Sequence, residues 1–252
     1  MYRFETFQRK ALIKSSLPAP RNERKISNWH KRHPPIGRGI LAGTGSMGGA
    51  LVKQLASAGL SVILGSRDAA KAKATAAEVS EAIKKPVKGL KLDEAAAAGD
   101  VIFWTVSGPL ADREALLKTL AEPLRGKIII DTTNILNLLD ESAWGQVSST
   151  LLNEKALGVP ARWTTAFKAT FSQLLRDPPP ASNPHSIFVA GDDEEAVDIT
   201  IALVDTIPGF KGTKAGPLKN SKIIELLGPK WMPEVVKLNA WQTFRSGWRL
   251  SD

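Results

Sequence analysis

The clearest chemical signal in the sequence is a glycine-rich run that follows a short apolar segment. The run consists of Gly43, Thr44, Gly45, Ser46, Met47 and Gly48. In a strand–turn–helix unit, this GxGxxG spacing permits a tight turn, lets backbone N–H groups approach a pyrophosphate and lets the helix pack closely on the sheet. The pyrophosphate then lies at the helix N-terminus, where free N–H groups and the helix dipole favour an anion. The run predicts a dinucleotide site, and a merely structural turn is the alternative.

The end of the second predicted strand distinguishes NAD from NADP. An NAD site places Asp or Glu about 20 residues after the glycines to bind the ribose 2′-hydroxyl, whereas an NADP site offers cations there. This chain has Ser66, Arg67 and then Lys71. Arg67 can bind a 2′-phosphate through two N–H groups, and Ser66 can donate another hydrogen bond. Asp68 is expected to cap the next helix, pointing away from the ribose. We therefore predict NADP(H) as the cofactor.

These residues need a fold that brings several strand ends together. Strands are expected at 40–42, 61–64, 101–106, 127–131, 163–167 and 186–190, and helices at 46–58, 69–84, 113–120 and 194–204. This alternation predicts an α/β fold, with a Rossmann-type, doubly wound and mostly parallel sheet. The predicted divisions are a basic arm, extended or disordered, at 1–38, an NADP-binding domain at 39–180, and a small domain at 181–252 that completes the substrate cleft.

Composition narrows the class of protein. The 252 residues include no cysteine, which excludes disulfide scaffolds, cysteine-ligated metals and thiol nucleophiles, and we expect no metal site. The net charge of +9 is concentrated in residues 1–38, which hold ten basic and two acidic residues, whereas the rest holds 24 and 23. Nucleic-acid binding needs a basic face on the folded domain, so no nucleic-acid partner is expected.

Location is predicted from the apolar runs and from the arm. No run approaches the roughly 18 apolar residues of a membrane span, so we expect no membrane span and a cytoplasmic protein. The basic arm, which is poor in acidic residues, makes mitochondrial targeting a second possibility.

Taken together, these motifs resemble the NADPH-dependent coenzyme F420 reductases, or F420H2:NADP oxidoreductases, from about Gly39 to Trp231. The matching blocks are GTGSMG at 43–48 with ILGSRD at 63–68, IIIDTTN at 128–134, FVAGDD at 188–193, and GF at 209–210 with AGPL at 215–218. The resemblance implies a Rossmann-type domain and a small second domain with the second redox partner bound between them. It also implies a homodimer by analogy.

The resemblance assigns roles by motif position. It implies that the 2′-phosphate is bound by Thr44, Ser66, Arg67 and Lys71, and the pyrophosphate by Gly45, Ser46 and Met47. It implies that the nicotinamide ribose is flanked by Thr105, Val106 and Ser107 at one strand end and by Asn134 at the next. The implied reaction is direct hydride transfer between NADP(H) and a flavin, a deazaflavin or another small conjugated acceptor, with no obligatory protein acid or base.

One block departs from the family, and two other functions stay open. Where the family reads KAFNT, this chain has TAFKA at 165–169, which makes Lys168 a candidate contact for an anionic acceptor in the substrate cleft, with a surface position as the alternative. Trp104 and Trp163 are expected either to line a pocket for a flat substrate or to pack in the core or in a dimer interface. The alternatives are a non-catalytic NADPH sensor or assembly protein and a reductase of the imine or β-hydroxyacid type. Against the latter, only about 35 residues follow Pro217, too few for the large helical domain of that class.

Overall fold

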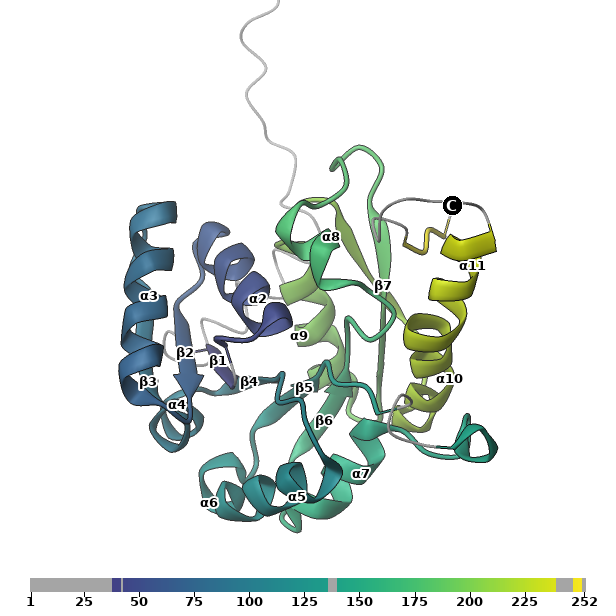
Figure 1. Ribbon diagram of the computed structural model, residues 1–252, viewed down its shortest axis with the longest axis horizontal. Coiled ribbons are helices and arrows are strands. Elements are labelled where there is room, and N and C mark those ends of the chain that lie inside the picture. The colour runs from purple at the N-terminus through teal and green to yellow at the C-terminus, as the bar shows by residue number, and fades with distance from the viewer. Residues whose placement is uncertain (1–37, 42, 136–139, 239–246, 251–252) are drawn as a thin grey trace, which may run out of the picture.

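The structure, a computed structural model, describes residues 38–41, 43–135, 140–238 and 247–250. In this part of the chain, eight strands form one sheet in the order β3-β2-β1-β4-β5-β6-β7-β8, and helices lie on both of its faces (Figure 1). The strands are β1 (Arg38–Leu41), β2 (Val62–Ser66), β3 (Lys88–Lys91), β4 (Val101–Trp104), β5 (Ile128–Asp131), β6 (Arg162–Thr165), β7 (His185–Gly191) and β8 (Phe210–Lys214).

The helices alternate with the strands along most of the chain. They are α2 (Ser46–Ser57), α3 (Ala69–Ile83), α4 (Leu92–Ala98), α5 (Leu110–Thr119), α6 (Ala121–Leu124), α7 (Ser149–Leu157), α8 (Ser172–Arg176), α9 (Glu194–Asp205), α10 (Ser221–Glu225) and α11 (Met232–Leu238). The remaining helical segments are two short 3₁₀ turns, η2 (Glu141–Ala143) and η3 (Leu218–Asn220), and a π-helical segment, η4 (Leu226–Trp231).

The first six strands form the parallel part of the sheet. The strand order reverses between β1 and β4, and both of their neighbours, β2 and β5, pair with them in parallel. All residues of these four strands are buried, because helices cover both faces. In such sheets, ligands bind outside the carboxyl ends of the strands at the point of reversal. The predicted mostly parallel, Rossmann-type sheet is confirmed.

The last two strands form a ribbon that departs from the parallel part. Strand β7 runs antiparallel to β6 and pairs with it only at Thr164–Gly191 and Thr165–Ala190. From His185 to Val189 it pairs in parallel with β8. The β7–β8 ribbon therefore extends beyond the carboxyl end of β6. The predicted boundary at residue 180 falls just before this ribbon, and because one sheet joins both sides, the division into two domains stays a prediction.

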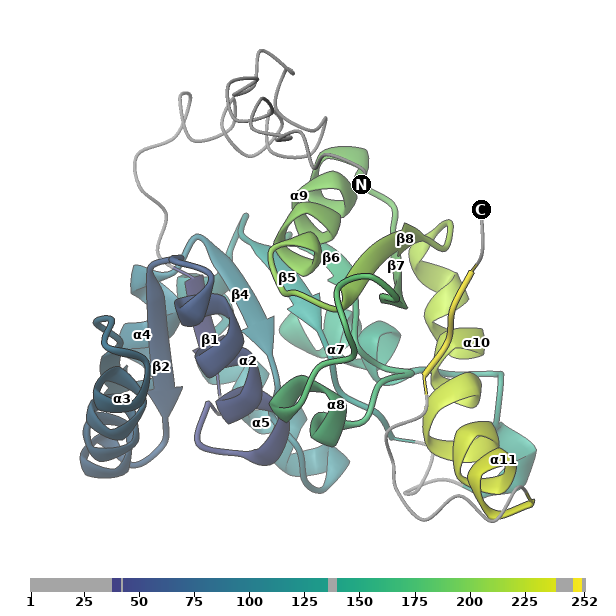
Figure 2. The same ribbon diagram turned by 90° about the horizontal axis from the view of Figure 1, so that it is seen from above.

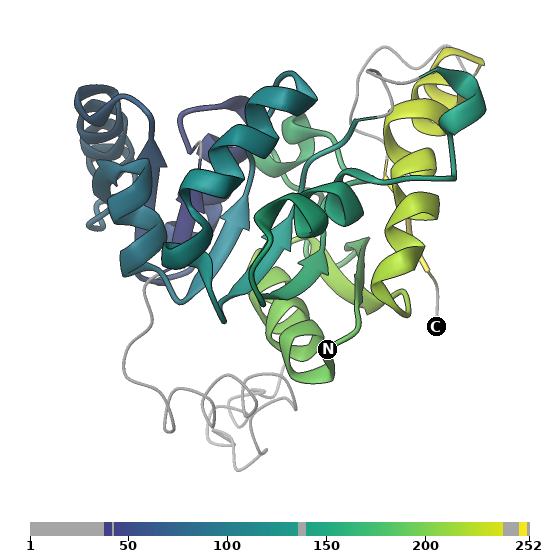
Figure 3. The same cartoon turned by 90° about the horizontal axis from the view of Figure 1, so that it is seen from below.

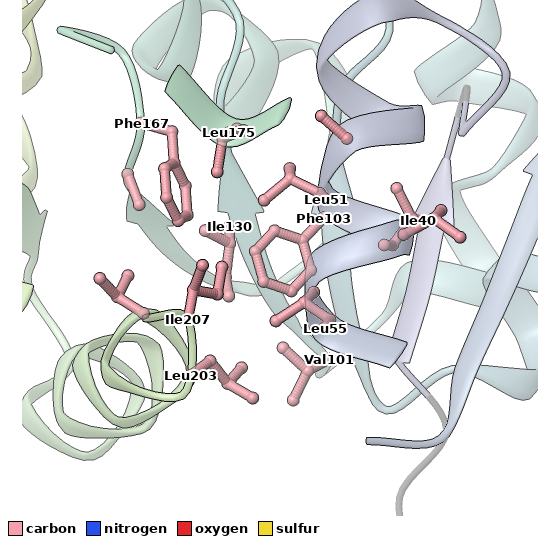
Figure 4. Close-up of a cluster of buried hydrophobic side chains, with 14 of the residues drawn as sticks. Ile40, Leu51, Leu55, Val101, Phe103, Ile130, Phe167, Leu175, Leu203 and Ile207 are labelled. Carbon is pink, nitrogen blue, oxygen red and sulfur yellow. The ribbon is translucent and has the colours of Figure 1, made fainter. Parts of the chain in front are cut away.

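The core has one layer on each face of the sheet. One layer packs α2, α8 and α9 against the strands through side chains that include Leu51, Phe103 and Ile130 (Figures 2 and 4). The other packs α4 to α7 around Trp104 and Trp163, and α5 to α7 are the teal helices of Figure 3. Trp104 is 0% exposed and Trp163 is 3% exposed. The expectation that these residues pack in the core is therefore confirmed, and the expectation that they line a substrate pocket is wrong.

The start of the sheet corrects one predicted boundary. Arg38, predicted to end the basic arm, is the first residue of β1, where it is buried in register with Val62 and Val101. The predicted arm up to residue 37, including its histidines, lies outside the described residues. Within the described residues, no helix is both long enough and apolar enough to cross a membrane.

An ion pair fixes α9 to β6 and makes stability depend on pH. Arg162 donates two hydrogen bonds of 2.7 Å to Asp193, whose carboxylate also caps α9 by accepting from the Ala196 N–H at 2.8 Å. The hydrogen bonds from Arg162 lower the pKa of Asp193 to about 2. Because an unfolded Asp has a pKa of about 4, the ionised form stabilises the fold above that pH, and this contribution is lost as the pH falls toward 2.

We therefore expect the advantage of the wild type over Asp193→Asn in free energy of unfolding to be constant above about pH 5 and to shrink between about pH 4 and pH 2. Asparagine still caps the helix, so the comparison isolates the charge. Urea unfolding at a series of pH values measures the difference. Glu78→Gln, on an exposed position of α3, is the control. If the difference in free energy of unfolding between the wild type and Asp193→Asn stays constant down to pH 2, the lowered pKa of Asp193 does not contribute to stability.

Candidate functional site

The glycine run forms the turn between β1 and α2, as predicted. A Cβ on Gly43 would lie 2.7 Å from Leu64 Cγ and 3.2 Å from the Ile40 carbonyl oxygen, so only glycine fits there. Gly45 is the N-cap of α2 in an extended conformation, with no side-chain capping bond. The Gly49 N–H donates to the Gly45 carbonyl at 2.8 Å, which leaves the preceding N–H groups of the first turn without an intrahelical acceptor.

The exposure of the run suits an anion site. Gly45 and Ser46 are exposed, Thr44 and Met47 are half-buried, and Gly48 is buried on the inner side of α2. Free N–H groups on an exposed helix start are the arrangement that binds phosphate in nucleotide-binding folds. The predicted pyrophosphate residues therefore lie together at one accessible helix end.

At the end of β2, the basic side chains are exposed, whereas the carboxylate is hydrogen-bonded to the next helix. Asp68 Oδ1 accepts from the Lys71 N–H at 3.0 Å and caps α3, which confirms the capping prediction. Ser66 is buried at the last position of β2, while Arg67 and Lys71 are exposed. The Gly43 N–H donates to the Gly65 carbonyl at 3.1 Å, so the glycine turn and this strand end are direct neighbours.

A cavity of about 280 Å³ lies beside Arg67. Its other lining residues come from the junction of β3 with α4 and from the C-terminal end of α5, and they are Lys91, Leu92, Asp93, Leu116, Thr119 and Leu120. The lining of the cavity thus combines apolar side chains with two cations and one carboxylate. Lys91 was not predicted as a site residue. It stands in register with Ser66 on the neighbouring edge strand.

The ends of β4 and β5 complete the same edge of the sheet. The Thr105 N–H and hydroxyl both donate to the Leu41 carbonyl, at 3.2 and 2.5 Å, so the segment after β4 is tied to the end of β1. Val106 is buried and Ser107 is exposed. Asn134 is exposed after β5, and its Nδ2 donates to the Lys168 carbonyl at 3.1 Å. The predicted cofactor residues thus follow four neighbouring strands, β2, β1, β4 and β5.

The structure corrects the prediction for Lys168. Its side chain is 0% exposed, so it is neither a surface residue nor an open contact for an acceptor. The ammonium donates to Glu225 Oε1 at 2.9 Å, to Ser149 Oγ at 2.7 Å and to the Thr133 carbonyl, with Asp131 Oδ2 at 3.6 Å. The sequence shows a lysine beside a cleft motif, but it does not show two carboxylates from distant elements turning inward to meet it.

The Lys168–Glu225 pair belongs to a larger buried polar cluster. Asp131 accepts from the Thr133 N–H and hydroxyl, both at 2.7 Å, and from Asn153 Nδ2 at 3.1 Å. Arg113, which is 1% exposed, donates to the Thr133 hydroxyl at 3.2 Å. Burial lowers the pKa of Arg113, and the nearby carboxylates oppose that shift. The cluster joins β5, α5, α7, α10 and the segment after β6, and its member Thr133 directly precedes Asn134 in the chain.

A second group that the sequence did not reveal lies at the glycine turn. Arg176 Nη2 donates to Ser46 Oγ at 2.6 Å, and the Ser172 hydroxyl lies 2.7 Å from the same oxygen. Both residues are on α8, which is held against α2 by a hydrogen bond of 2.6 Å from Gln54 Nε2 to the Leu175 carbonyl. A basic residue spaced four after a serine is too common a pattern to mark such a contact.

Among the described residues, no group of three or more histidines and carboxylates is arranged to hold a metal ion. The site therefore consists of a helix start, exposed cations, hydroxyls and one amide along the carboxyl edge of the sheet. Such a set can bind phosphates and orient a nucleotide.

Comparisons with known proteins agree with this arrangement. The family model described as NADP oxidoreductase, coenzyme F420-dependent, matches residues 38–135. The F420-dependent NADP reductase of Methanothermobacter marburgensis is 32% identical over 205 residues, which cover 75% of this chain and 88% of that protein. That of Methanocaldococcus jannaschii is 31% identical over 209 residues, with the same coverage of 75% and 88%.

A solved structure from Arthrobacter sp. FB24, assigned to the same class of reductase, supports the fold. It superposes with a TM-score of 0.67 at 23% identity and covers 86% of this chain and 100% of that one. The resemblance expected from the separated motifs is confirmed. Identity above 30% over most of the length of these relatives shows that the chain belongs to the family of F420-dependent NADP reductases.

Proposed function

We propose that the protein transfers hydride between NADPH and coenzyme F420. The observation that carries the nucleotide preference is at the end of β2, where Asp68 is engaged as a helix cap while Arg67 is exposed beside a cavity. A carboxylate turned toward the ribose would repel a 2′-phosphate, and here the carboxylate that follows Arg67, Asp68, is hydrogen-bonded to its own helix. The acceptor is taken from the family, whose curated relatives are named for F420.

The described residues fit NADP(H) along the carboxyl edge of the sheet. Thr44, Ser66, Arg67 and Lys71 would bind the 2′-phosphate, and Gly45, Ser46 and Met47 would bind the pyrophosphate. The adenine would enter the cavity beside Arg67, and the nicotinamide ribose would lie between Thr105, Val106 and Ser107 on one side and Asn134 on the other. Arg176 adds a cation within hydrogen-bond distance of Ser46 and would offset the pyrophosphate charge.

The chain contributes binding and orientation. When bound, NADPH supplies the hydride and the deazaflavin accepts it, so the protein needs no residue to form or break a covalent bond. Its groups instead hold the nicotinamide and deazaflavin rings in the relative orientation that transfer needs, and orientation of this kind supplies much of the rate enhancement in such reactions. No protein acid or base is required in this scheme, because the proton that completes the reduced deazaflavin comes from solvent. The homodimer implied by the resemblance stays a prediction.

A titration with two nucleotides tests the proposal. NADPH and NADH are added to the protein while tryptophan fluorescence is followed, and the absorbance of NADPH and of F420 is then recorded with F420, FMN or FAD present. We expect tighter binding of NADPH than of NADH, and turnover with F420. Turnover with FMN or FAD but not with F420 would mean that the acceptor is a flavin. Binding without any turnover would favour an NADPH sensor. If neither nucleotide binds, the proposal is wrong.

A further inference from the structure

The segment after β6 is held in a strained turn against Asn134. Phe167 is buried and has φ of +59°, a left-handed conformation that is costly for a bulky residue. Such strain persists only where the surroundings fix the backbone, and it concentrates near functional sites. The next residue, Lys168, offers its carbonyl to Asn134 Nδ2 at 3.1 Å. The conformation of the turn therefore decides where the acceptor for this amide lies.

The side chain of Lys168 binds the neighbouring peptide of the same turn. Its ammonium donates to the Thr133 carbonyl, one residue before Asn134. Residues 133 and 134 are thus held by both the side chain and the backbone of Lys168. Glu225 fixes the ammonium at 2.9 Å, and its Oε1 also accepts from the Ser149 N–H at 2.7 Å. The buried carboxylate from α10 therefore determines where Lys168 can hold the turn.

The helix that carries Glu225 also packs against the backbone of the strained turn. A Cβ on Gly228 would lie 2.2 Å from the Lys168 carbonyl oxygen and 2.8 Å from the Ala169 Cα, so the helix touches this turn through bare backbone. Gly228 lies in η4, a π-helical segment, and such segments recur at functional sites. The α10–η4 unit thus meets the turn twice, through a carboxylate and through a glycine.

We propose that Lys168 and Glu225 are positioning residues, whose buried ion pair holds the Asn134 amide in the orientation that hydride transfer requires. The inference rests on the proposed function, which places Asn134 beside the nicotinamide ribose. Neither side chain touches the cofactor. Their effect passes through the Phe167–Ala169 turn to one amide, at a site where a displacement of about 1 Å can cost about 100-fold in rate.

A double-mutant cycle between Glu225→Gln and Asn134→Ala tests this route. Glutamine keeps the shape and an acceptor for Ser149 but removes the charge that fixes Lys168. We expect Glu225→Gln to lower kcat for F420 reduction by NADPH roughly 10- to 100-fold with little change in KM. In the Asn134→Ala background, Glu225→Gln should add little further loss, because the group through which it acts is gone.

The control is Glu195→Gln, which removes an exposed partner of Arg162 on α9 and should leave kcat unchanged. Losses that multiply in the double variant, or a wild-type kcat in Glu225→Gln, would overturn the proposal. If Glu225→Gln does not fold, the pair is replaced together as Lys168→Met with Glu225→Met, since an apolar pair can substitute for a buried ion pair. A folded protein of this kind with wild-type kcat would equally overturn it.

The wild type separates this proposal from the proposed function. If it binds NADPH but does not reduce F420, the proposed reaction fails, and the same cycle is read on the fluorescence of the bound nicotinamide. The positioning role then requires that Glu225→Gln alter this fluorescence and that the change disappear in the Asn134→Ala background. An unaltered fluorescence in Glu225→Gln would reject it.

Discussion

Lys168→Met is expected to lower the free energy of unfolding by about 3 to 5 kcal/mol, because it removes one partner of a buried ion pair and leaves the other uncompensated. Glu225 and Asp131 are both 0% exposed, and the remaining nearby cation, Arg113, supplies one positive charge against these two carboxylates, so one negative charge stays uncompensated. Urea or thermal unfolding measures the loss.

Two further variants show whether the cost comes from the stranded charge. Lys214→Met removes an ion pair with Glu194 and Asp198 at a half-exposed position on β8, and it should cost no more than about 1 kcal/mol. Lys168→Met with Glu225→Met should recover much of the loss, because no unpaired glutamate remains. Equal destabilisation by Lys168→Met and Lys214→Met would mean that burial contributes nothing to the pair.

Arg67→Ala is expected to weaken NADPH binding by about 1 to 3 kcal/mol, or roughly 5- to 150-fold in Kd, from the value of charge-assisted hydrogen bonds. Binding of NADH, which lacks the 2′-phosphate, should change little. The Kd values are measured by quenching of tryptophan fluorescence. Arg125→Ala, which removes an exposed partner of Glu122 on the turn after α6, is the control. Equal losses for the two nucleotides would show that Arg67 does not bind the 2′-phosphate.

Features set by local sequence were predictable. The glycine run, the start of α2 and the Asp68 cap follow from residues within a few positions of one another, and the structure has all three. Edge strands were missed for a physical reason. Strands β3 and β8 read KGLK and FKGTK, with lysines that suit a sheet edge and give no apolar run.

Contacts between distant segments could not be predicted from the sequence. Lys168 was predicted to contact an acceptor in the cleft or to lie on the surface, and its burial instead depends on Glu225 from α10 and on Asp131 at the end of β5. Arg176 meets Ser46 only because α8 packs on α2. A single sequence carries no signal for such pairings, since each side chain taken alone looks like an ordinary exposed charge.

The β7–β8 ribbon has a consequence for how acceptor preference can diverge. It shares two residue pairs with β6 and is otherwise held by its own ladder, by α9, and by the packing of Phe188 and Ala190 against α10 and Trp248. It also extends beyond the carboxyl edge along which the nucleotide residues lie (Figure 1). Because so few residue pairs join the unit from 185 to 214 to β6, we expect substitutions in this unit to leave the predicted nucleotide residues on β1, β2, β4 and β5 in place.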